Sequence, residues 1–241
     1  MLPKAFAFDV FGTVVDWRGG IARESAPFLA AIGRAEIDGH AFADAWRARY
    51  QPAMAAVREG RRDWVILDLL HREMLEETLR RSGIDPARLG ETALAEWTRA
   101  WHRLAPWPDA VAGLARLRAR FPVVTLSNGN VALQVNLARH AGLTWDAICG
   151  AELARAYKPD PQAYLATAAA LGLAPGQLCL VAAHHSDLAA ARACGLLTAY
   201  VDRPQEYGGR PAPDAHLAQD WDWRADDFTG LADRLGCRAD L

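Results

Sequence analysis

Short apolar runs recur along the chain, separated by segments with the periodicity of amphipathic helices. The first run, Lys4 to Val10, reads KAFAFDV and is apolar on both faces of an extended chain. Interior strands of parallel sheets have this pattern because helices cover both faces of the sheet. Comparable runs lie at Pro122 to Leu126, Trp145 to Cys149, Leu178 to Ala183 and Leu197 to Val201. The alternation predicts an α/β fold with a Rossmann-like, doubly wound parallel sheet.

Residues typical of helix ends flank the intervening segments. We expect Asp109 to cap a helix that runs through Arg120. Asp160, followed by Pro161, is expected to open the next helix, since proline is favoured in a first helical turn. Gly142 stands where a helix should end, because glycine adopts the left-handed conformation of many helix C-termini.

A long insertion interrupts this alternation between the first and second predicted strands. More than a hundred residues separate these strands, whereas a crossover connection needs only a few tens. The segment has no convincing strand but about four helical patterns, such as the apolar face formed by Val65, Leu69, Leu70, Met74 and Leu79. We therefore predict a core of residues 1–17 and 105–241 and a helical cap domain of residues 18–104.

Composition excludes several classes of protein. Half of the 241 residues are hydrophobic, 23% are charged, and the formal net charge is −2. This balance predicts a well-packed globular protein without the basic field that nucleic acid attracts. No apolar run approaches the roughly 20 residues that cross a bilayer, so no membrane partner is expected. Four widely spaced cysteines match neither a zinc site nor a disulfide scaffold, and we expect a reduced, cytoplasmic protein.

Four polar sets follow predicted strands or approach predicted helices. They are Asp9 to Thr13 (DVFGT), Ser127-Asn128-Gly129, Lys158-Pro159, and His184 to Asp187 (HHSD). Each alone has an ordinary structural explanation, as a helix cap, a turn or a helix stop. Together and in this order they indicate an active site, since ligands of open α/β sheets bind outside the carboxyl ends of the strands.

These sets resemble the four motifs of the haloacid dehalogenase superfamily. The match covers essentially the whole chain through DVFGT, LSNGN, YKPDPQAY and an Asp after an apolar strand. The helical insertion, Arg47 in Ala45-Trp46-Arg47, and Tyr164 six residues beyond Lys158 further resemble the type II (S)-2-haloacid dehalogenases. The resemblance implies a haloacid dehalogenase-like core with a cap, and hydrolysis of a small-molecule 2-halocarboxylate through a covalent Asp9 ester.

Two positions separate this chemistry from phosphate hydrolysis. Phosphatases of the superfamily carry a second acid two residues after the nucleophile, which protonates the alcohol leaving group. This chain has Phe11 there, and Ala183 stands four residues before Asp187, where a metal-binding carboxylate would be expected. A departing halide needs neither the proton nor the metal. We therefore expect no metal and no cofactor, with Lys158 holding the buried Asp9 carboxylate ionised.

The resemblance also implies roles for the remaining site residues. Ser127 and the backbone N–H groups around Val10 and Phe11 would hold the substrate carboxylate, and Arg47 with Asn128 would stabilise the departing halide. Thr13 and Tyr164 would fix the geometry of Asp9 and Lys158, and Asp187 would orient or deprotonate water. The family usually has Ser and Asn just before this acid, where this chain has Ala182 and His184. His184 is expected either to replace the Asn as a neutral water acceptor or to be a hydrogen-bonded structural histidine.

Several alternatives remain open at the level of sequence. The same motifs would serve a metal-dependent phosphatase, a hydrolase that opens a small carboxylate-bearing ring, or an inactive binding protein on this fold. Side-chain identities do not specify the halogen, the chain length of the substrate or its handedness. Dimers are common in the resembling family, and a homodimer is one expected state, since apolar residues of a cap interface and of the cap interior look alike in sequence.

Overall fold

A single six-stranded parallel sheet forms the centre of the molecule. The computed structural model describes residues 2–237, and its strands are ordered β3-β2-β1-β4-β5-β6, with every neighbouring pair parallel. The first strand therefore lies in the middle, between the second and the fourth. The strand bounds are β1 Ala5–Phe8, β2 Val123–Ser127, β3 Ala147–Gly150, β4 Leu178–Ala182, β5 Leu197–Val201 and β6 Trp223–Ala225.

Alternating side chains of β1 enter two separate hydrophobic cores. Phe6 and Phe8 face one side of the sheet, where Phe8 contacts Phe228 edge to face, while Ala5 and Ala7 face the other. All four residues of β1 are fully buried. Both faces must therefore be apolar, which is why the sequence of this strand shows no polar alternation.

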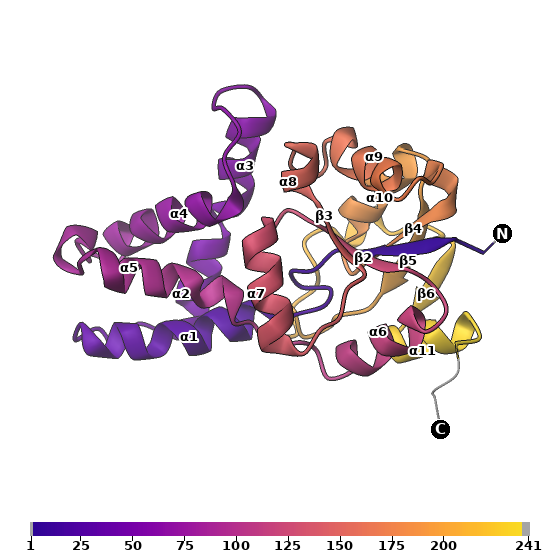
Figure 1. The fold of residues 1–241 in the computed structure, drawn as a ribbon. Helices are drawn as coiled ribbons and strands as arrows, with labels where there is room; N and C mark the ends of the chain where they lie inside the picture. Colours follow the sequence, from indigo (N-terminus) through magenta and orange to yellow (C-terminus); the bar gives the residue numbers. More distant parts are fainter. Residues whose placement is uncertain (1, 238–241) are drawn as a thin grey trace.

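Helices cover both faces of the sheet, as Figure 1 shows. α6 (Ala110–Arg118), α7 (Val131–Ala141) and α11 (Phe228–Arg234) pack on the core that contains Phe6 and Phe8. α9 (Pro161–Ala170) and α10 (His185–Ala193) pack on the opposite core, and the short α8 (Ala151–Ala154) precedes them. The predicted doubly wound α/β architecture is confirmed.

A helical segment, Trp17 to His102, projects to one side of the sheet and is called the cap here. Its α-helices are α1 (Trp17–Ala31), α2 (Gly39–Arg47), α3 (Tyr50–Arg58), α4 (Leu67–Arg81) and α5 (Glu91–Thr98). A short 3-10 helix, η1 (Pro86–Arg88), lies between α4 and α5, and a second, η2 (Arg99–His102), follows α5. The division of the chain into two folding units at residues 18 and 104 stays a prediction.

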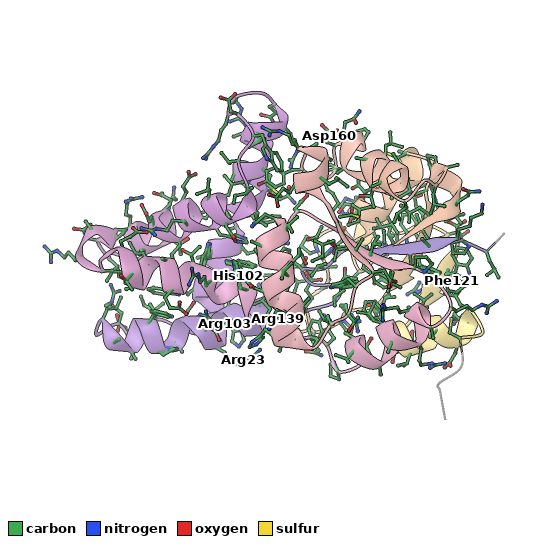
Figure 2. The ribbon with its side chains drawn as sticks, in the orientation of Figure 1. Arg23, His102, Arg103, Phe121, Arg139 and Asp160 are labelled. Atoms are coloured by element: carbon green, nitrogen blue, oxygen red, sulfur yellow. The ribbon has the colours of Figure 1, made fainter. Side chains whose placement is uncertain are left out.

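A polar network ties the cap to α7 of the core. The Asp68 backbone N–H donates to Asn130 Oδ1 at 3.1 Å, and Asn130 Nδ2 donates to Asp68 Oδ2 at 2.9 Å. His102 connects Asp68 to Asn136 through its two ring nitrogens, at 3.0 and 3.1 Å. His102 is labelled in Figure 2, at the side where the cap meets α7. These contacts fix the cap over one end of the sheet.

Two local expectations differ from the structure. Asp109 precedes α6 as predicted, but its side chain makes no cap; instead it pairs with Arg203 at 2.7 Å and accepts from the Phe228 backbone N–H at 2.8 Å. A buried Arg is a stronger partner for a carboxylate than a helix N–H. The strand β6 was not predicted, because its three residues include the exposed Arg224 and carry no apolar run. Asp160 caps α9 by accepting from Gln162, and Gly142 ends α7 with a left-handed φ of 67°, both as predicted.

Candidate active site

The four polar sets converge where strands of the sheet end. Asp9 follows β1, Ser127 ends β2, Lys158 follows α8, and His184 with Asp187 follow β4. Most of them border a cavity of about 570 Å³ between these strand ends and the cap helices α2 and α3. The cavity is lined by Asp9, Phe11, Arg47, Ala48, Tyr50, Gln51, Arg58, Asn128, Lys158, Pro159, Tyr164, His184, Ser186, Asp187, Tyr207, Pro213 and Asp214.

The Asp9 carboxylate is buried and hydrogen-bonded at both oxygens. Its side chain is 10% exposed. Oδ1 accepts from Lys158 Nζ at 2.9 Å, and Oδ2 accepts from Thr13 Oγ1 at 2.7 Å and from His184 Nδ1 at 3.0 Å. Burial by itself would raise the pKa of this carboxyl, but the Lys158 charge and the hydrogen bonds from His184 and Thr13 outweigh it and lower the pKa far below its ordinary value. Asp9 is therefore ionised.

Lys158 bridges Asp9 to a second buried acid, Asp187. Its Nζ donates to Asp187 Oδ2 at 2.5 Å, and Tyr164 OH donates to Asp187 Oδ1 at 2.6 Å. Burial opposes the charge on Lys158, yet the carboxylates of Asp187 and Asp9 raise its pKa above the ordinary value. Asp187 differs from Asp9, because burial raises its pKa and the charge of Asp9 adds to the effect, although Lys158 opposes both. One acid thus stays charged while the other can more readily take up a proton.

A backbone N–H just after β4 holds the Thr13 side chain in place. Its Oγ1 accepts from the backbone N–H of Ala183 at 2.9 Å, which directs the hydroxyl proton at Asp9. Residue 183 thus contributes a backbone donor. Its alanine side chain offers no oxygen, in agreement with the sequence argument.

His184 lies between two carboxylates. Besides Asp9, it contacts Glu206 through Nε2, at 2.9 Å to Oε1 and 3.1 Å to Oε2. Glu206 is 2% exposed and also accepts from the Trp17 indole at 2.9 Å. Burial would lower the pKa of His184, but Glu206 and Asp9 raise it well above its ordinary value. The two carboxylates therefore favour the protonated form of His184, in which both ring nitrogens donate.

Both ring nitrogens of His184 face carboxylates, which favours the hydrogen-bonded histidine of the two sequence expectations over a neutral acceptor for water. A histidine with a carboxylate at each nitrogen is stabilised as the cation and has no free lone pair. Sequence reasoning missed Glu206, because this residue lies in a loop without strand or helix periodicity. The one signal was an acid close after the strand β5, in the peptide Asp202-Arg203-Pro204-Gln205-Glu206.

Arg47, the last residue of α2, lines the cavity and has no carboxylate partner among residues 2–237. Its guanidinium carbon lies 3.9 Å from the ring centre of Tyr50 and 5.3 Å from that of Trp17. Its Nη1 is buried and has no hydrogen-bond partner within residues 2–237. A guanidinium on aromatic faces keeps its charge while its edge is left for an anion. The role of Arg47 toward a halide stays a prediction.

Asn128 lines the cavity and Ser127 lies just behind it. Asn128 Oδ1 accepts from the Lys158 backbone N–H at 2.8 Å, and its Nδ2 approaches Met54 Sδ at 3.2 Å. Ser127 is fully buried, and its Oγ accepts from Gly129 N–H at 3.1 Å and from Gln134 Nε2 at 2.8 Å. Because Oγ already accepts twice, its own proton is free to be donated. Gln134, which sequence reasoning missed, orients this hydroxyl.

The turn after Asp9 presents backbone donors. The N–H groups of Val10 and Phe11 have no backbone or side-chain acceptor within the described part of the chain, although both residues are buried. Buried N–H groups are rarely left unpaired, so such a pair favours a bound anion. The Phe11 ring packs edge to face on Trp101 at 5.7 Å and forms an apolar wall of the cavity.

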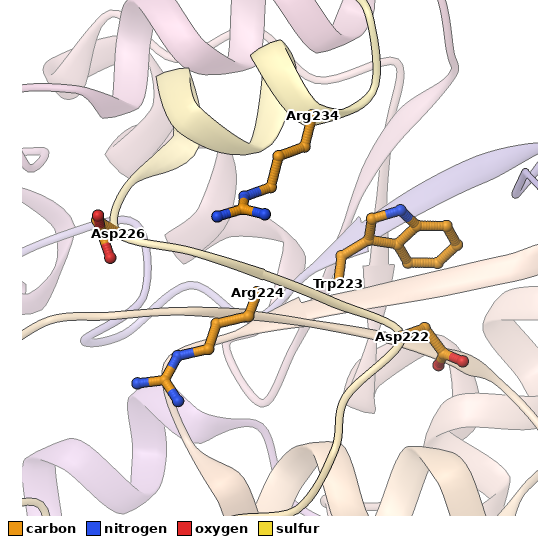
Figure 3. A pocket seen from close by; sticks show the side chains of 5 residues that line it. All are labelled: Asp222, Trp223, Arg224, Asp226 and Arg234. Carbon is orange, nitrogen blue, oxygen red and sulfur yellow. The ribbon is translucent and has the colours of Figure 1, made fainter.

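A second cavity, also about 570 Å³, lies at the sheet edge formed by β6. Figure 3 shows its lining side chains, which are Asp222, Trp223, Arg224, Asp226 and Arg234. The Asp222 carboxylate accepts a hydrogen bond from the Thr198 backbone N–H at 2.8 Å and another from the Thr198 hydroxyl at 2.7 Å. This cavity brings together no buried nucleophile and base, so the chemistry belongs to the cavity around Asp9.

Comparison with known proteins identifies the family. A family model described as haloacid dehalogenase-like hydrolase matches residues 3–195. A defluorinating L-2-haloacid dehalogenase of known structure is 51% identical, with a TM-score of 0.94 over 97% of this chain and 95% of the other. An L-2-haloacid dehalogenase from Xanthobacter autotrophicus, with chloropropionic acid covalently bound, is 25% identical with a TM-score of 0.79, covering 98% and 99% of the two chains.

Relatives with a different activity are also similar. A phosphoglycolate phosphatase from Neisseria gonorrhoeae is 27% identical over 82% of this chain and 79% of its own length. Dehalogenases and phosphatases thus share this fold and much of this sequence pattern. Individual residues of the cavity have to distinguish the two chemistries.

No helix among residues 2–237 has both the length and the apolar character needed to span a bilayer. All four cysteines are free thiols.

Proposed function

This chain belongs to the haloacid dehalogenase-like hydrolases, and we propose that it hydrolyses the carbon–halogen bond of a small (S)-2-haloalkanoic acid through a covalent ester of Asp9, without a metal. The observation that carries the proposal is the contrast within one cavity. Asp9 is held ionised by Lys158, while Arg47 faces the cavity with a buried and unpartnered Nη1. A charged nucleophile thus faces an unneutralised cation suited to an anionic leaving group.

Neighbouring residues disfavour phosphoryl transfer. Phe11 occupies the position at which a phosphatase needs an acid for its leaving group, and it packs on Trp101 rather than facing a proton acceptor. Ala183 supplies only its backbone N–H, which Thr13 accepts. Asp9 and Asp187 already share the ammonium of Lys158 between them. This arrangement supports halide displacement over phosphate hydrolysis.

The hydrogen bonds of Asp9 distinguish its two oxygens in the first step. Oδ2 accepts two hydrogen bonds and Oδ1 accepts one, so a lone pair of Oδ1 remains free. Oδ1 attacks the halogen-bearing carbon from the side opposite the halogen. The new C–O bond forms as the C–X bond breaks, and the halide leaves with the electron pair toward Arg47 and Asn128. Ser127 and the N–H groups of Val10 and Phe11 hold the substrate carboxylate.

Hydrolysis of the ester uses Asp187, Thr13 and His184. Asp187, whose raised pKa suits a general base, removes a proton from water as the water oxygen bonds to the Asp9 carboxyl carbon. Negative charge develops on Oδ2, where Thr13 and the His184 cation already donate, so these two act as an oxyanion hole. The ester bond then breaks, the alkoxide takes the proton from Asp187, and the regenerated Asp9 carboxyl releases its own proton.

A halide-release panel tests the proposal. Wild-type protein is offered (S)- and (R)-2-chloropropanoate, 2-bromoacetate, fluoroacetate, a carboxylate that carries a small strained ring, and a generic aryl phosphate. We expect halide release from the (S)-acid, with inversion at the reacting carbon, and no phosphate release. Turnover of the aryl phosphate alone would support the phosphatase candidate, product only from a strained carboxylate-bearing ring would support the ring-opening hydrolase, and no turnover would support a binding protein.

The homodimer and the cytoplasmic location expected from the sequence stay predictions. Light scattering after size-exclusion chromatography tests the first, and fractionation of the source cells tests the second.

A further inference from the structure

Segments of the cap bind the backbone that carries the catalytic lysine. Arg58, the last residue of α3, donates from Nη1 to the Lys158 carbonyl oxygen at 3.2 Å. The preceding residue, Tyr157, donates from its hydroxyl to the Val65 carbonyl oxygen at 2.8 Å and packs against the Trp64 ring at 4.7 Å. Figure 1 shows α3 standing beside the loop around α8.

A fourth contact closes the arrangement through Asn128. Its amide approaches Met54 Sδ of α3 at 3.2 Å on one side, and its Oδ1 accepts the Lys158 backbone N–H at 2.8 Å on the other. The backbone of Lys158 is therefore held at its N–H by a core residue that touches the cap, and at its C=O by the cap itself. We call this set the clasp: Met54, Arg58, Trp64 and Val65 of the cap with Asn128, Tyr157 and Lys158 of the core.

The clasp sets the backbone from which the Lys158 side chain reaches the two acids. Its Nζ must reach Asp9 Oδ1 at 2.9 Å and Asp187 Oδ2 at 2.5 Å at the end of a flexible four-carbon stem. The ionisation of Asp9 depends on that position, since Lys158 supplies the main charge that lowers its pKa. Displacement of an ammonium by about 1 Å in a catalytic arrangement can cost about 100-fold in rate.

We propose that Arg58 is a positioning residue that holds the Lys158 backbone from the cap, and so aligns the ammonium that keeps Asp9 ionised. This rests on the proposed function. The contacts of Val65 with Tyr157 and of Met54 with Asn128 hold the same stretch of backbone from the cap side. Arg58 acts through Lys158 and does not itself touch the reacting atoms.

The sequence offers an internal standard for testing this. Lys4 and Lys158 are the only lysines in the chain, all other basic side chains being Arg or His. Lys4 is exposed, and Lys158 is 7% exposed and ion-paired. Brief acylation with acetic anhydride, read by mass spectrometry of the two lysine-containing peptides, reports access to Lys158 relative to Lys4 without any need for activity.

The experiment compares wild type with Arg58→Met, Arg58→Lys and the control Arg61→Met. Arg61 lies on the same cap but is exposed and pairs only with Glu59. For Arg58→Met we expect kcat for (S)-2-chloropropanoate to fall about 10- to 100-fold, with KM changed much less. In the pH profile of kcat, the acid limb of this variant should lie at higher pH than that of wild type, because a misplaced Lys158 lets the pKa of Asp9 rise. Acylation of Lys158 relative to Lys4 should increase several-fold.

The controls separate positioning from other roles. Arg58→Lys keeps a donor for the Lys158 carbonyl and should restore most of kcat, and Arg61→Met should match wild type in every readout. If Arg58→Met does not fold, Tyr157→Phe removes another clasp contact and is expected to show the same acylation and pH shifts. The proposal would be overturned if folded Arg58→Met had the same kcat and the same Lys158 acylation as wild type. A change in KM alone would overturn it as well. Inactive wild-type protein would instead refute the proposed function.

Discussion

Replacing Glu206 by Gln should move the alkaline limit of activity to lower pH. Gln has nearly the same shape and can still accept the Trp17 indole proton, but it removes the negative charge beside His184 Nε2. A hydrogen bond to a charged group contributes about 1.5–3 kcal/mol. Losing it should lower the pKa of His184 toward its ordinary value, because the charge of Glu206 is the largest of the contributions that raise this pKa. The catalytically required cation is then lost sooner as pH rises.

The assay is a pH profile of kcat for halide release, with thermal unfolding recorded across the same range. A group whose pKa is raised by folding stabilises the native state fully below its unfolded value, about 6.5 for His, and loses this contribution as pH rises through the raised pKa. Wild type should therefore be more thermally stable than Glu206→Gln, and the difference in stability should be largest below about pH 6.5. This difference should become smaller at alkaline pH. An unmoved alkaline limb would show that His184 is not a cation in the working enzyme.

Three further outcomes follow from the site. Halide release should survive excess EDTA, since Ala183 offers no metal ligand beside Asp187; loss that Mg²⁺ restores would contradict the metal-free mechanism. Asp9→Asn should fold, judged by circular dichroism, yet lose at least about three orders of magnitude in kcat, because only binding and positioning remain; near-normal turnover would exclude Asp9 as nucleophile. Arg47→Ala should lower kcat about 10²- to 10³-fold with a cooperative melt retained; loss of helix without a specific rate defect would make Arg47 structural.

The sequence predicted the parts of this molecule that follow from local pattern. Apolar runs such as that around Phe6 and Phe8 have no helical length and no polar face, so the buried strands could be recognised. The site residues that follow those strands could be named because parallel strands bring their carboxyl ends to one edge. Asp9, Lys158, Tyr164 and Asp187 do meet there.

Other features depend on contacts between residues distant in the chain. Glu206 reaches His184 and Trp17 from a loop after β5, and no periodicity marks that loop. Asp109 has a helix-capping sequence, but Arg203, 94 residues away, is the partner that its side chain takes. The protonation of His184 could not be inferred, because it depends on two carboxylates meeting at one ring.

The central claim is that Asp9 forms an ester whose carboxyl carbon is attacked by water. A single turnover in ¹⁸O-water, with enzyme in excess over (S)-2-chloropropanoate, tests it directly. We expect the heavy oxygen in the peptide that contains Asp9 and none in the hydroxyl of the 2-hydroxyacid, with label reaching the product only after several turnovers. Label in the product hydroxyl during the first turnover, with none in Asp9, would contradict the account and replace the covalent mechanism by direct attack of water on the substrate carbon.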